Sequence, residues 1–236
     1  MAGKPQTTAV HPGPGFRIRR DFERPPKELI EQYAKYPTPD ISDLMNRLYA
    51  LSPKIRNLVN KQKLIGPACT VKVFPGDNLM VHKALDLAKP GDVIVVDTGG
   101  RQTNAICGEL VSQKAKHRGI AGFVIDGLIR DLPGLKEIGL PIYARGTTPV
   151  GPMQRGPGEI NHQISCGGIV INPGDLIVAD QTGVVVVRND YMETLLERLH
   201  SWDKEFSVYC KEVAKGNFNN EWADRLLDGS NVEYID

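Results

Sequence analysis

The chain has 236 residues, of which 41% are hydrophobic and 24% are charged, and its formal net charge is +1. This length and composition are typical of a globular protein with one large domain or two small ones. A charge so near zero gives no overall field toward nucleic acid or a membrane surface, and 6% aromatic residues give no stacking platform for bases. We therefore expect neither nucleic acid nor a membrane as a partner.

The sequence signals for location favour the cytoplasm. No apolar run approaches the ~20 residues that a membrane helix needs, and residues 1–20 contain no apolar core of a signal peptide. The four cysteines lie far apart and form no CxxC pair: Cys69, Cys107, Cys166 and Cys210. Their spacing favours reduced, mostly buried thiols over disulfides or a zinc site.

The N-terminal part of the chain begins with an arm and continues with helices. Residues 1–26 are rich in proline and glycine and are expected to be irregular. Prolines at the start of the next segment suit a first helical turn, and Asp40 is placed to cap the helix after it. We predict helices over 25–36 and 38–48, a connection over 49–67 and a strand over 68–74.

The middle of the chain alternates strands and helices, which favours an α/β layer structure. Its strands are short apolar runs, as expected for strands that are buried on both faces. Asp77 is placed to cap one helix, and Gly119 suits the end of another. The predicted helices begin after Asp77 and cover 108–119 and 132–139, and the strands cover 92–97, 122–126 and 140–145.

The character of the sequence changes after Arg145. Residues 146–165 are rich in glycine and proline and predict a long ordered loop or short β turns. Strands are predicted over 167–171, 175–180 and 183–187, and helices over 190–214 and 220–227. Since no linker separates the α/β run from the β run, we expect a single domain over 27–236 with mixed β/β/α layering.

Arg130 and Asp131 form the most suggestive pair, because they follow a buried strand directly. Ligands of α/β proteins bind at the carboxyl ends of strands. An arginine fork matches a carboxylate, and an aspartate offers the hard oxygen that Mg²⁺ or Mn²⁺ prefers. The pair therefore suits a metal-bound 2-oxo acid. A solvated ion pair at the start of a helix explains the same residues.

Two further groups of residues are candidates for the same site. Gly108 and Glu109 open a helix, where backbone N–H groups favour an anion, although an acid in a first turn is also simply stabilising. Asn78 and His82 lie four residues apart and hence on one helical face. They suit the wall of a pocket, or else the start of a helix with a partly exposed histidine.

At this point the residues resemble a known family, the class II pyruvate aldolases. The resemblance rests on "GEL", on "GFVIDGLIRDLPGL" with "LPIYARGTTPVGP", and on "NPGDLIVADQTGVVVV". Its most specific mark is an acid followed, after twenty intervening residues, by Arg-Asp, here Glu109, Arg130 and Asp131. The family includes 4-hydroxy-4-methyl-2-oxoglutarate and 4-carboxy-4-hydroxy-2-oxoadipate aldolases, and also regulators of ribonuclease E activity and sequences labelled demethylmenaquinone methyltransferases. The match runs from about Pro37 to the long C-terminal helix.

The resemblance implies a β/β/α swivelling-domain fold with flanking N- and C-terminal helices, assembled as a homotrimer or homohexamer. It implies that Asp131 binds Mg²⁺ or Mn²⁺, that Arg130 binds the 2-oxo acid and stabilises the enolate, and that Glu109 orders metal-bound water. It further implies a carboxylate cradle and an acid from the neighbouring subunit. The cradle would comprise the amides near Gly108, Glu109, Leu110 and Val111, the same pocket would be lined by Asn78 and His82, and the acid would be Glu205.

The expected function is then metal-dependent retro-aldol cleavage of a 4-hydroxy-2-oxo acid to pyruvate and a second oxo acid. Oxaloacetate decarboxylation is expected as a side activity, since it forms the same enolate. The main alternative is an oligomeric regulator without catalysis that binds ribonuclease E or another protein. A methyltransferase is disfavoured, because no glycine-rich nucleoside-binding loop follows a first strand.

Overall fold

The structure is a computed structural model that describes residues 11, 13–233 and 235. The chain divides into two compact units, Met1–Leu196 and Glu197–Asp236, and each is described by itself. The first unit contains every strand that the described residues form and the helices that pack on them. It is a mixed α/β fold with one large sheet.

The strands of the first unit vary from two to ten residues. In chain order they are β1 (Phe16–Ile18), β2 (Arg56–Asn57), β3 (Leu64–Val73), β4 (Val93–Asp97), β5 (Ala105–Cys107), β6 (Gly122–Ile129), β7 (Ile142–Thr147), β8 (Gly158–Ile160), β9 (Ile164–Cys166), β10 (Ile169–Ile171), β11 (Leu176–Ala179) and β12 (Val184–Val187). The helices are α1 (Lys27–Tyr33), α2 (Thr38–Leu44), α3 (Leu79–Leu87), α4 (Glu109–His117), α5 (Leu132–Ile138) and the beginning of α6 (Met192–Ala214), which a 3₁₀ turn at Asn189–Tyr191 precedes.

The large sheet is parallel at its centre and antiparallel toward its edges. Its main path runs β1-β8-β3-β4-β6-β7-β2, and the neighbours β3, β4, β6 and β7 are parallel. β5 adds to β6 in parallel, while β11 pairs antiparallel with β3 and β12. Because the central strands are parallel, their carboxyl ends meet at one edge, and the helices that follow them begin there.

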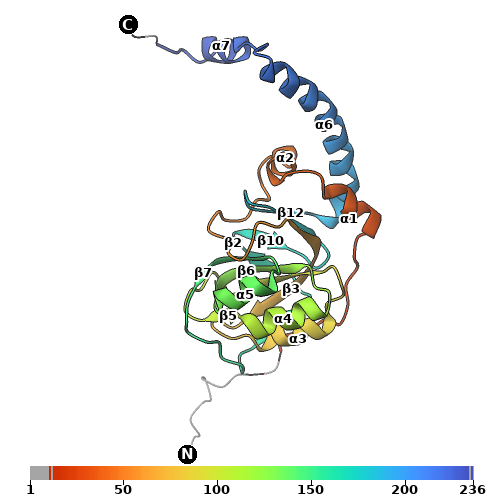
Figure 1. Ribbon diagram of the computed structural model, residues 1–236, viewed down its shortest axis with the longest axis vertical. Coiled ribbons are helices and arrows are strands. Elements are labelled where there is room, and N and C mark those ends of the chain that lie inside the picture. The colour runs from red at the N-terminus through yellow and green to blue at the C-terminus, as the bar shows by residue number, and fades with distance from the viewer. Residues whose placement is uncertain (1–10, 12, 234, 236) are drawn as a thin grey trace, which may run out of the picture. The chain divides into compact units, whose positions relative to one another are not determined.

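The central strands are covered on both faces. Figure 1 shows α3, α4 and α5 together on one side of the sheet, with β10 and β12 on the other. Within β4, Ile94 and Val96 belong to the core under the helices, and Val93 and Val95 belong to the core under the β layer. All four are fully buried, and burying each contributes roughly 1.5–3 kcal/mol. The two faces of this strand thus pack into two different cores, and the mixed α/β class expected from the sequence is confirmed.

The N-terminal arm is not irregular throughout, which corrects one expectation. Phe16–Ile18 forms β1 and pairs in parallel with Gly158–Ile160. Arg17 donates from Nε to Glu159 at 2.7 Å, and Arg24 holds the buried Asp92 with two hydrogen bonds of 2.8 and 2.7 Å. The arm is therefore tied to the sheet by a strand pairing and two ion pairs. The part of the arm formed by residues 1–10 and 12 lies outside the described residues.

Three other expectations are corrected at element ends. β3 begins at Leu64, inside the segment predicted as a connection, because Leu64–Pro67 pairs with β11. β8 lies in the segment predicted as a loop or short turns, because its partners β1 and β3 are distant in sequence, and β9 begins at the end of that segment and pairs with the next strand, β10. β6 continues past the predicted strand to Ile129 by pairing with β5 and β7.

Helix α2 is capped differently from the prediction. It begins at Thr38, so Asp40 lies within its first turn. The cap comes instead from Asp180, whose carboxylate accepts hydrogen bonds from Thr38 N at 2.8 Å and Thr38 Oγ1 at 2.7 Å. The helix ends at Leu44, earlier than predicted, because Asn46 and Arg47 have left-handed backbones with φ of 56° and 62°.

The second unit, Glu197–Asp236, contains the rest of α6 and α7 (Glu221–Asp228). Both helices match the predicted segments. Trp202 and Phe206 stack with ring centroids 5.2 Å apart. Many large hydrophobic side chains of this unit are exposed, among them Val208, Tyr209, Phe218, Trp222 and Leu226. Among the described helices of the whole chain, none is both long enough and apolar enough to cross a membrane.

Candidate active site

A pocket of about 300 Å³ opens where β5 and β6 end and α3, α4 and α5 begin. Seven of the sequence candidates meet in it, together with residues that the sequence did not single out. Its lining consists of Asn78, His82, Ile106, Cys107, Gly108, Leu110, Val111, Lys114, Arg130, Asp131, Pro152 and Gln154. The parallel strands thus bring four separated segments of the chain to one place.

Arg130 and Asp131 lie side by side at the end of β6. Arg130 Nε is 3.5 Å from Asp131 Oδ2, and both side chains are more than 40% exposed. The backbone N–H of Arg130 donates to Cys107 O at 3.0 Å, which fixes the two strand ends together. Asp131 has a left-handed backbone with φ of 59°, an uncommon conformation for a residue with a side chain. Such strain is typical of functional sites, because the surrounding structure must hold it.

Three glycines leave room for the charged side chains. A Cβ at Gly108 would lie 2.5 Å from Asp131 Oδ2, and a Cβ at Gly151 would lie 2.6 Å from Arg130 Nη1. A Cβ at Gly134 would overlap the Glu109 carboxylate. None of these glycines has a left-handed φ, so their contribution is the space left by the missing Cβ and not a special backbone conformation.

Glu109 takes part through its backbone more directly than through its side chain. Its N–H donates to Asp131 Oδ2 at 3.3 Å, as the first residue of α4. The side chain lies against Gly134 of α5, and Glu109 is not among the residues that line the pocket. The structure therefore brings Glu109 beside Asp131, and its role with a ligand stays a prediction.

Asn78 supplies a buried acceptor to the pocket. It is 3% exposed, and its Nδ2 donates to Ile106 O at 3.1 Å. This bond fixes the orientation of the amide, and Oδ1 is left without a hydrogen-bond partner. An unpaired buried acceptor costs roughly 1–3 kcal/mol. A ligand or water that donates a hydrogen bond to Oδ1 would remove that cost.

His82 is one turn further along α3 and faces the same pocket. Its Nε2 lies 3.4 Å from Gln154 Nε2, on the loop that follows β7. Burial and, to a smaller extent, the charge of Lys114 lower the pKa of His82. The imidazole is therefore neutral at pH 7 and can accept or donate one hydrogen bond.

Asp77 holds the loop that carries Gln154. Its Oδ1 accepts from Leu79 N at 2.8 Å, and its Oδ2 accepts from Arg155 N and Gly156 N at 2.6 and 2.8 Å. The predicted capping role is thus confirmed, although the helix boundary places Asn78 at the cap position. One buried carboxylate fixes both the start of α3 and the wall of the pocket.

The segment that carries the pocket matches a known protein family. A model of the RraA-like family, described as Aldolase/RraA, matches residues 38–186, which is more than half of the chain. The chain belongs to this family.

The RraA-like relatives include proteins with provisional aldolase names. One from Halalkalibacterium halodurans, provisionally named 4-hydroxy-4-methyl-2-oxoglutarate aldolase, is 47% identical over 72% of this chain and 81% of its own length. Another with the same provisional name, from Hahella chejuensis, is 37% identical over 64% of this chain and 93% of its own length.

Solved RraA-like structures share the fold. One described as RraAS2 of Streptomyces coelicolor, "an unusual member of the RNase ES inhibitor RraA protein family", has a TM-score of 0.72 and 31% identity. The match covers 79% of this chain and 98% of that one. The resemblance inferred from the sequence motifs is confirmed at the level of the family.

The RraA-like site offers a divalent cation one carboxylate. In the described part of the chain, no three histidine, cysteine or acidic side chains gather as a ligand set. Mg²⁺ usually keeps several waters and takes one or two carboxylates, with the substrate completing its shell. Asp131 at the open mouth of the pocket, more than 40% exposed, fits that pattern. A tetrahedral zinc site, which needs three or four protein ligands, does not fit.

Cys107 lines the pocket but is not available as a nucleophile. Burial, with the Asp131 charge as a second cause, raises the pKa of the Cys107 thiol to about 12. A thiol that is protonated at neutral pH is a poor nucleophile and a poor metal ligand. Cys107 therefore adds no reactive group to the charged side chains that line the pocket, which are Arg130, Asp131 and Lys114.

The remaining candidates and the residues that sequence reasoning missed complete the site. Leu110 and Val111 line the pocket as predicted, whereas Glu205 lies on α6 in the Glu197–Asp236 unit, and its part in a neighbouring site stays a prediction. Pro152 and Gln154 were missed because a loop of distant sequence carries them. Lys114 had a usable signal, since it lies four residues after Leu110 and hence on the same helical face.

Proposed function

We propose that the protein is a divalent-metal-dependent aldolase that cleaves a 4-hydroxy-2-oxo acid to pyruvate and a second oxo acid. The observation that carries the proposal is the Arg130–Asp131 pair at the mouth of the pocket. The same pocket is lined by Asn78, whose buried Oδ1 has no hydrogen-bond partner. The provisional names of the relatives support it. We also propose the swivelling-domain arrangement for the fold, which the separate cores on the two faces of β4 support.

In the proposed reaction the bond between C3 and C4 breaks, and its electron pair passes to the pyruvate enolate. A base takes the proton of the C4 hydroxyl, C4 becomes the carbonyl carbon of the second oxo acid, and the enolate takes up a proton at C3. A bound Mg²⁺ or Mn²⁺ would supply Lewis-acid stabilisation of the charge that develops on the keto oxygen.

The chain's own residues bind and orient the substrate. The Arg130 guanidinium presents a planar fork to the C1 carboxylate and adds positive charge beside the developing enolate. Asp131 would hold the cation, and Gly108 gives its carboxylate the space to do so. Asn78 Oδ1 would accept a hydrogen bond from a ligand hydroxyl or water. Oxaloacetate decarboxylation would pass through the same enolate and is proposed as a side activity.

The test is pyruvate release from 4-hydroxy-4-methyl-2-oxoglutarate and from oxaloacetate, with Mg²⁺ or Mn²⁺ and then with EDTA. We expect turnover of both that EDTA abolishes. Asp131→Ala should lose metal-dependent turnover while keeping its thermal transition. Asp43→Ala, which removes an exposed carboxylate on α2, is the matched control. Full activity of Asp131→Ala would remove the metal assignment.

A regulatory role is the second candidate, because the chain resembles one structure described as a member of the RNase ES inhibitor RraA family and another described as an RNA-processing inhibitor. In that case the wild-type protein would release no pyruvate and would bind ribonuclease E stoichiometrically. Sedimentation of the protein alone would test the homotrimer or homohexamer that we propose for either role. Calorimetric titration of the two metals would decide between Mg²⁺ and Mn²⁺.

A further inference from the structure

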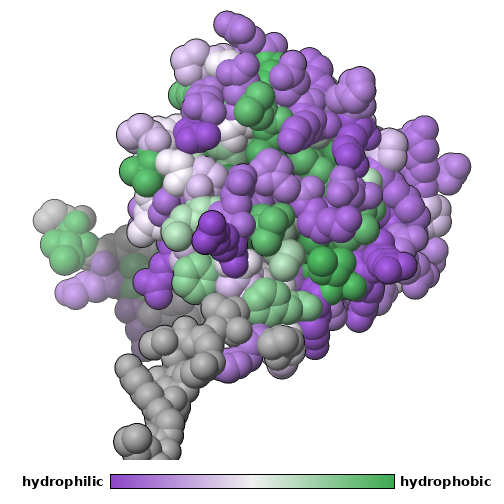
Figure 2. Space-filling view, turned by 90° about the horizontal axis from the view of Figure 1, so that it is seen from below, coloured by the Kyte–Doolittle hydropathy of each residue, from purple (hydrophilic) through white to green (hydrophobic). Residues whose placement is uncertain are grey.

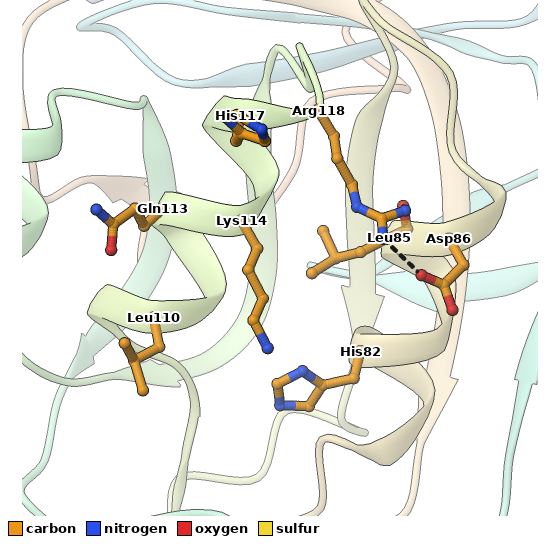
Figure 3. A pocket seen from close by; sticks show the side chains of 8 residues that line it. All are labelled: His82, Leu85, Asp86, Leu110, Gln113, Lys114, His117 and Arg118. Carbon is orange, nitrogen blue, oxygen red and sulfur yellow. Dashed lines mark hydrogen bonds and ion pairs between the residues drawn. The ribbon is translucent and has the colours of Figure 1, made fainter.

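A second and larger cavity adjoins the candidate active site. It measures about 640 Å³ and lies between α3 and α4, as Figure 3 shows. Its lining consists of His82, Leu85, Asp86, Leu110, Gln113, Lys114, His117 and Arg118. Three of these residues, His82, Leu110 and Lys114, also line the smaller pocket. The two spaces therefore share a wall, and a ligand held at Arg130 and Asp131 can extend past that wall into the groove.

The groove is basic, and most of its charge is already paired. Arg118 donates to Asp86 Oδ1 at 2.8 Å and to Leu85 O at 2.6 Å, so its guanidinium is held at the far end. Asp86 is thus ion-paired with Arg118, and its Oδ2 also lies 3.3 Å from Lys83 Nζ. The Arg118–Asp86 pair is the dashed interaction in Figure 3.

Lys114 differs from its neighbours at the shared wall. Among the described residues it has no ion pair and no side-chain hydrogen bond, whereas Lys116 on the same helix donates to Ile138 O at 2.5 Å. Figure 3 shows the Lys114 side chain extending from α4 across the groove toward His82 on α3. Its charge is felt there, because it contributes to the lowered pKa of His82. With His82 neutral, Lys114 is the cation that a ligand meets on leaving the smaller pocket.

The hydrophobic side chains around Lys114 leave its ammonium group accessible to a ligand. The side chain of Leu110 at the same wall is 71% exposed, as are large parts of Val150 and Met153 near the pocket. Figure 2 shows the face seen from below, on which hydrophobic residues lie among hydrophilic ones. Lys114 is itself exposed, so its ammonium group is accessible to an anionic ligand, and water and salt partly screen the attraction.

We propose that Lys114 selects substrates by pairing with a carboxylate on the C4 side of the scissile bond. This inference rests on the proposed aldolase function and names a specificity residue for it. The C1 carboxylate and the keto oxygen are accounted for by Arg130 and the cation that Asp131 would hold. The remainder of the substrate then leads to the shared wall, where Lys114 is the unpaired cation. Preferred substrates are accordingly 2-oxo acids with a second carboxylate.

The test compares Lys114→Met with Lys116→Met on two substrates. 4-Hydroxy-4-methyl-2-oxoglutarate carries two carboxylates, and 4-hydroxy-2-oxopentanoate carries one. Methionine keeps the length of the apolar stem and removes the charge. For Lys114→Met we expect the ratio of kcat/KM for the dicarboxylate over that for the monocarboxylate to fall about tenfold, mainly through KM. That size is typical of a charge-assisted hydrogen bond that solvent partly screens. Lys116→Met should leave the ratio unchanged.

Two further measurements separate charge from structure. Lys114→Arg should restore most of the ratio, and the wild-type preference for the dicarboxylate should weaken as salt increases. An unchanged ratio in Lys114→Met, or wild-type turnover of the monocarboxylate alone, would overturn the inference and leave the aldolase proposal standing. Wild-type protein that releases no pyruvate from either substrate would overturn both.

Discussion

Replacing Gly108 by alanine tests how the site holds the Asp131 carboxylate. Gly108 precedes α4 with φ of −144° and ψ of −168°, an extended conformation that alanine adopts without strain. The added Cβ would lie 2.5 Å from Asp131 Oδ2 and 3.1 Å from Arg130 Cγ. The perturbation is therefore one methyl group pushed between the two charged side chains.

The size of the effect follows from these distances. Ordinary contact with a Cβ begins at 3.4 Å, so the carboxylate oxygen must retreat by about 0.9 Å. A misplacement of about 1 Å in a catalytic group can cost about 10²-fold in rate. Because the Asp131 side chain is 43% exposed, it can move outward, and the free energy of unfolding should change by less than ~1 kcal/mol.

The assay is kcat/KM for pyruvate release, with the free energy of unfolding from urea titration measured in parallel. We expect Gly108→Ala to lose about 100-fold in kcat/KM and to bind Mg²⁺ more weakly by calorimetry. Gly183→Ala is the matched control, because no atom lies within 4 Å of the added Cβ and φ is not left-handed. If Gly108→Ala kept activity within twofold of Gly183→Ala, our account of how the carboxylate is held would be wrong.

Two more predictions concern charge. Arg130→Lys should lower kcat/KM for pyruvate release at least tenfold, about 1.4 kcal/mol, because a point charge does not replace the planar fork; near-normal rates would argue against bidentate binding. Burial opposes ionisation of Asp180, but hydrogen bonds from Thr38 and Thr182 outweigh it and lower its pKa below the usual 3.8. Its stabilising contribution is then complete above that value and is lost as the pH falls toward the folded-state pKa. The difference in urea stability between wild type and Asp180→Asn should therefore shrink between pH 6 and pH 3, and a constant difference would contradict the cap on α2.

Local sequence patterns predicted most of the first unit. The continuous apolar strand Val93–Asp97 and the helix that ends before Gly119 are visible because their signals lie within about ten residues. β1 and β8 were not predicted, since three residues in a glycine- and proline-rich segment become a strand only through a partner far away in the chain. The cap of α2 was missed for the same reason, because it comes from Asp180, which is distant in sequence.

The site was predictable to a similar extent. Arg130, Asp131, Gly108 and Asn78 stand at the ends of predicted elements, with His82 one turn along its helix. The rule that ligands bind at the carboxyl ends of parallel strands brings them together. No comparable rule identifies the glycines that leave space for the charged side chains. Gly134 and Gly151 leave space for the Glu109 and Arg130 side chains, which lie against them only in three dimensions. Nothing in their own neighbourhood in the sequence carries that information.

The pairing of β3 also bears on how the chain reaches its native state. The first residues of β3, Leu64–Pro67, pair with Leu176–Ala179, and its later residues pair with β4 and β8. Contacts between segments so distant in sequence form late, because a long loop must close first. During synthesis on the ribosome, the backbone groups of Leu64–Pro67 therefore lack their β11 partner until most of the chain has emerged. The β11–β12 hairpin covers this edge. Pairing of the early strand β3 is therefore complete only when the later segment 176–187 is present.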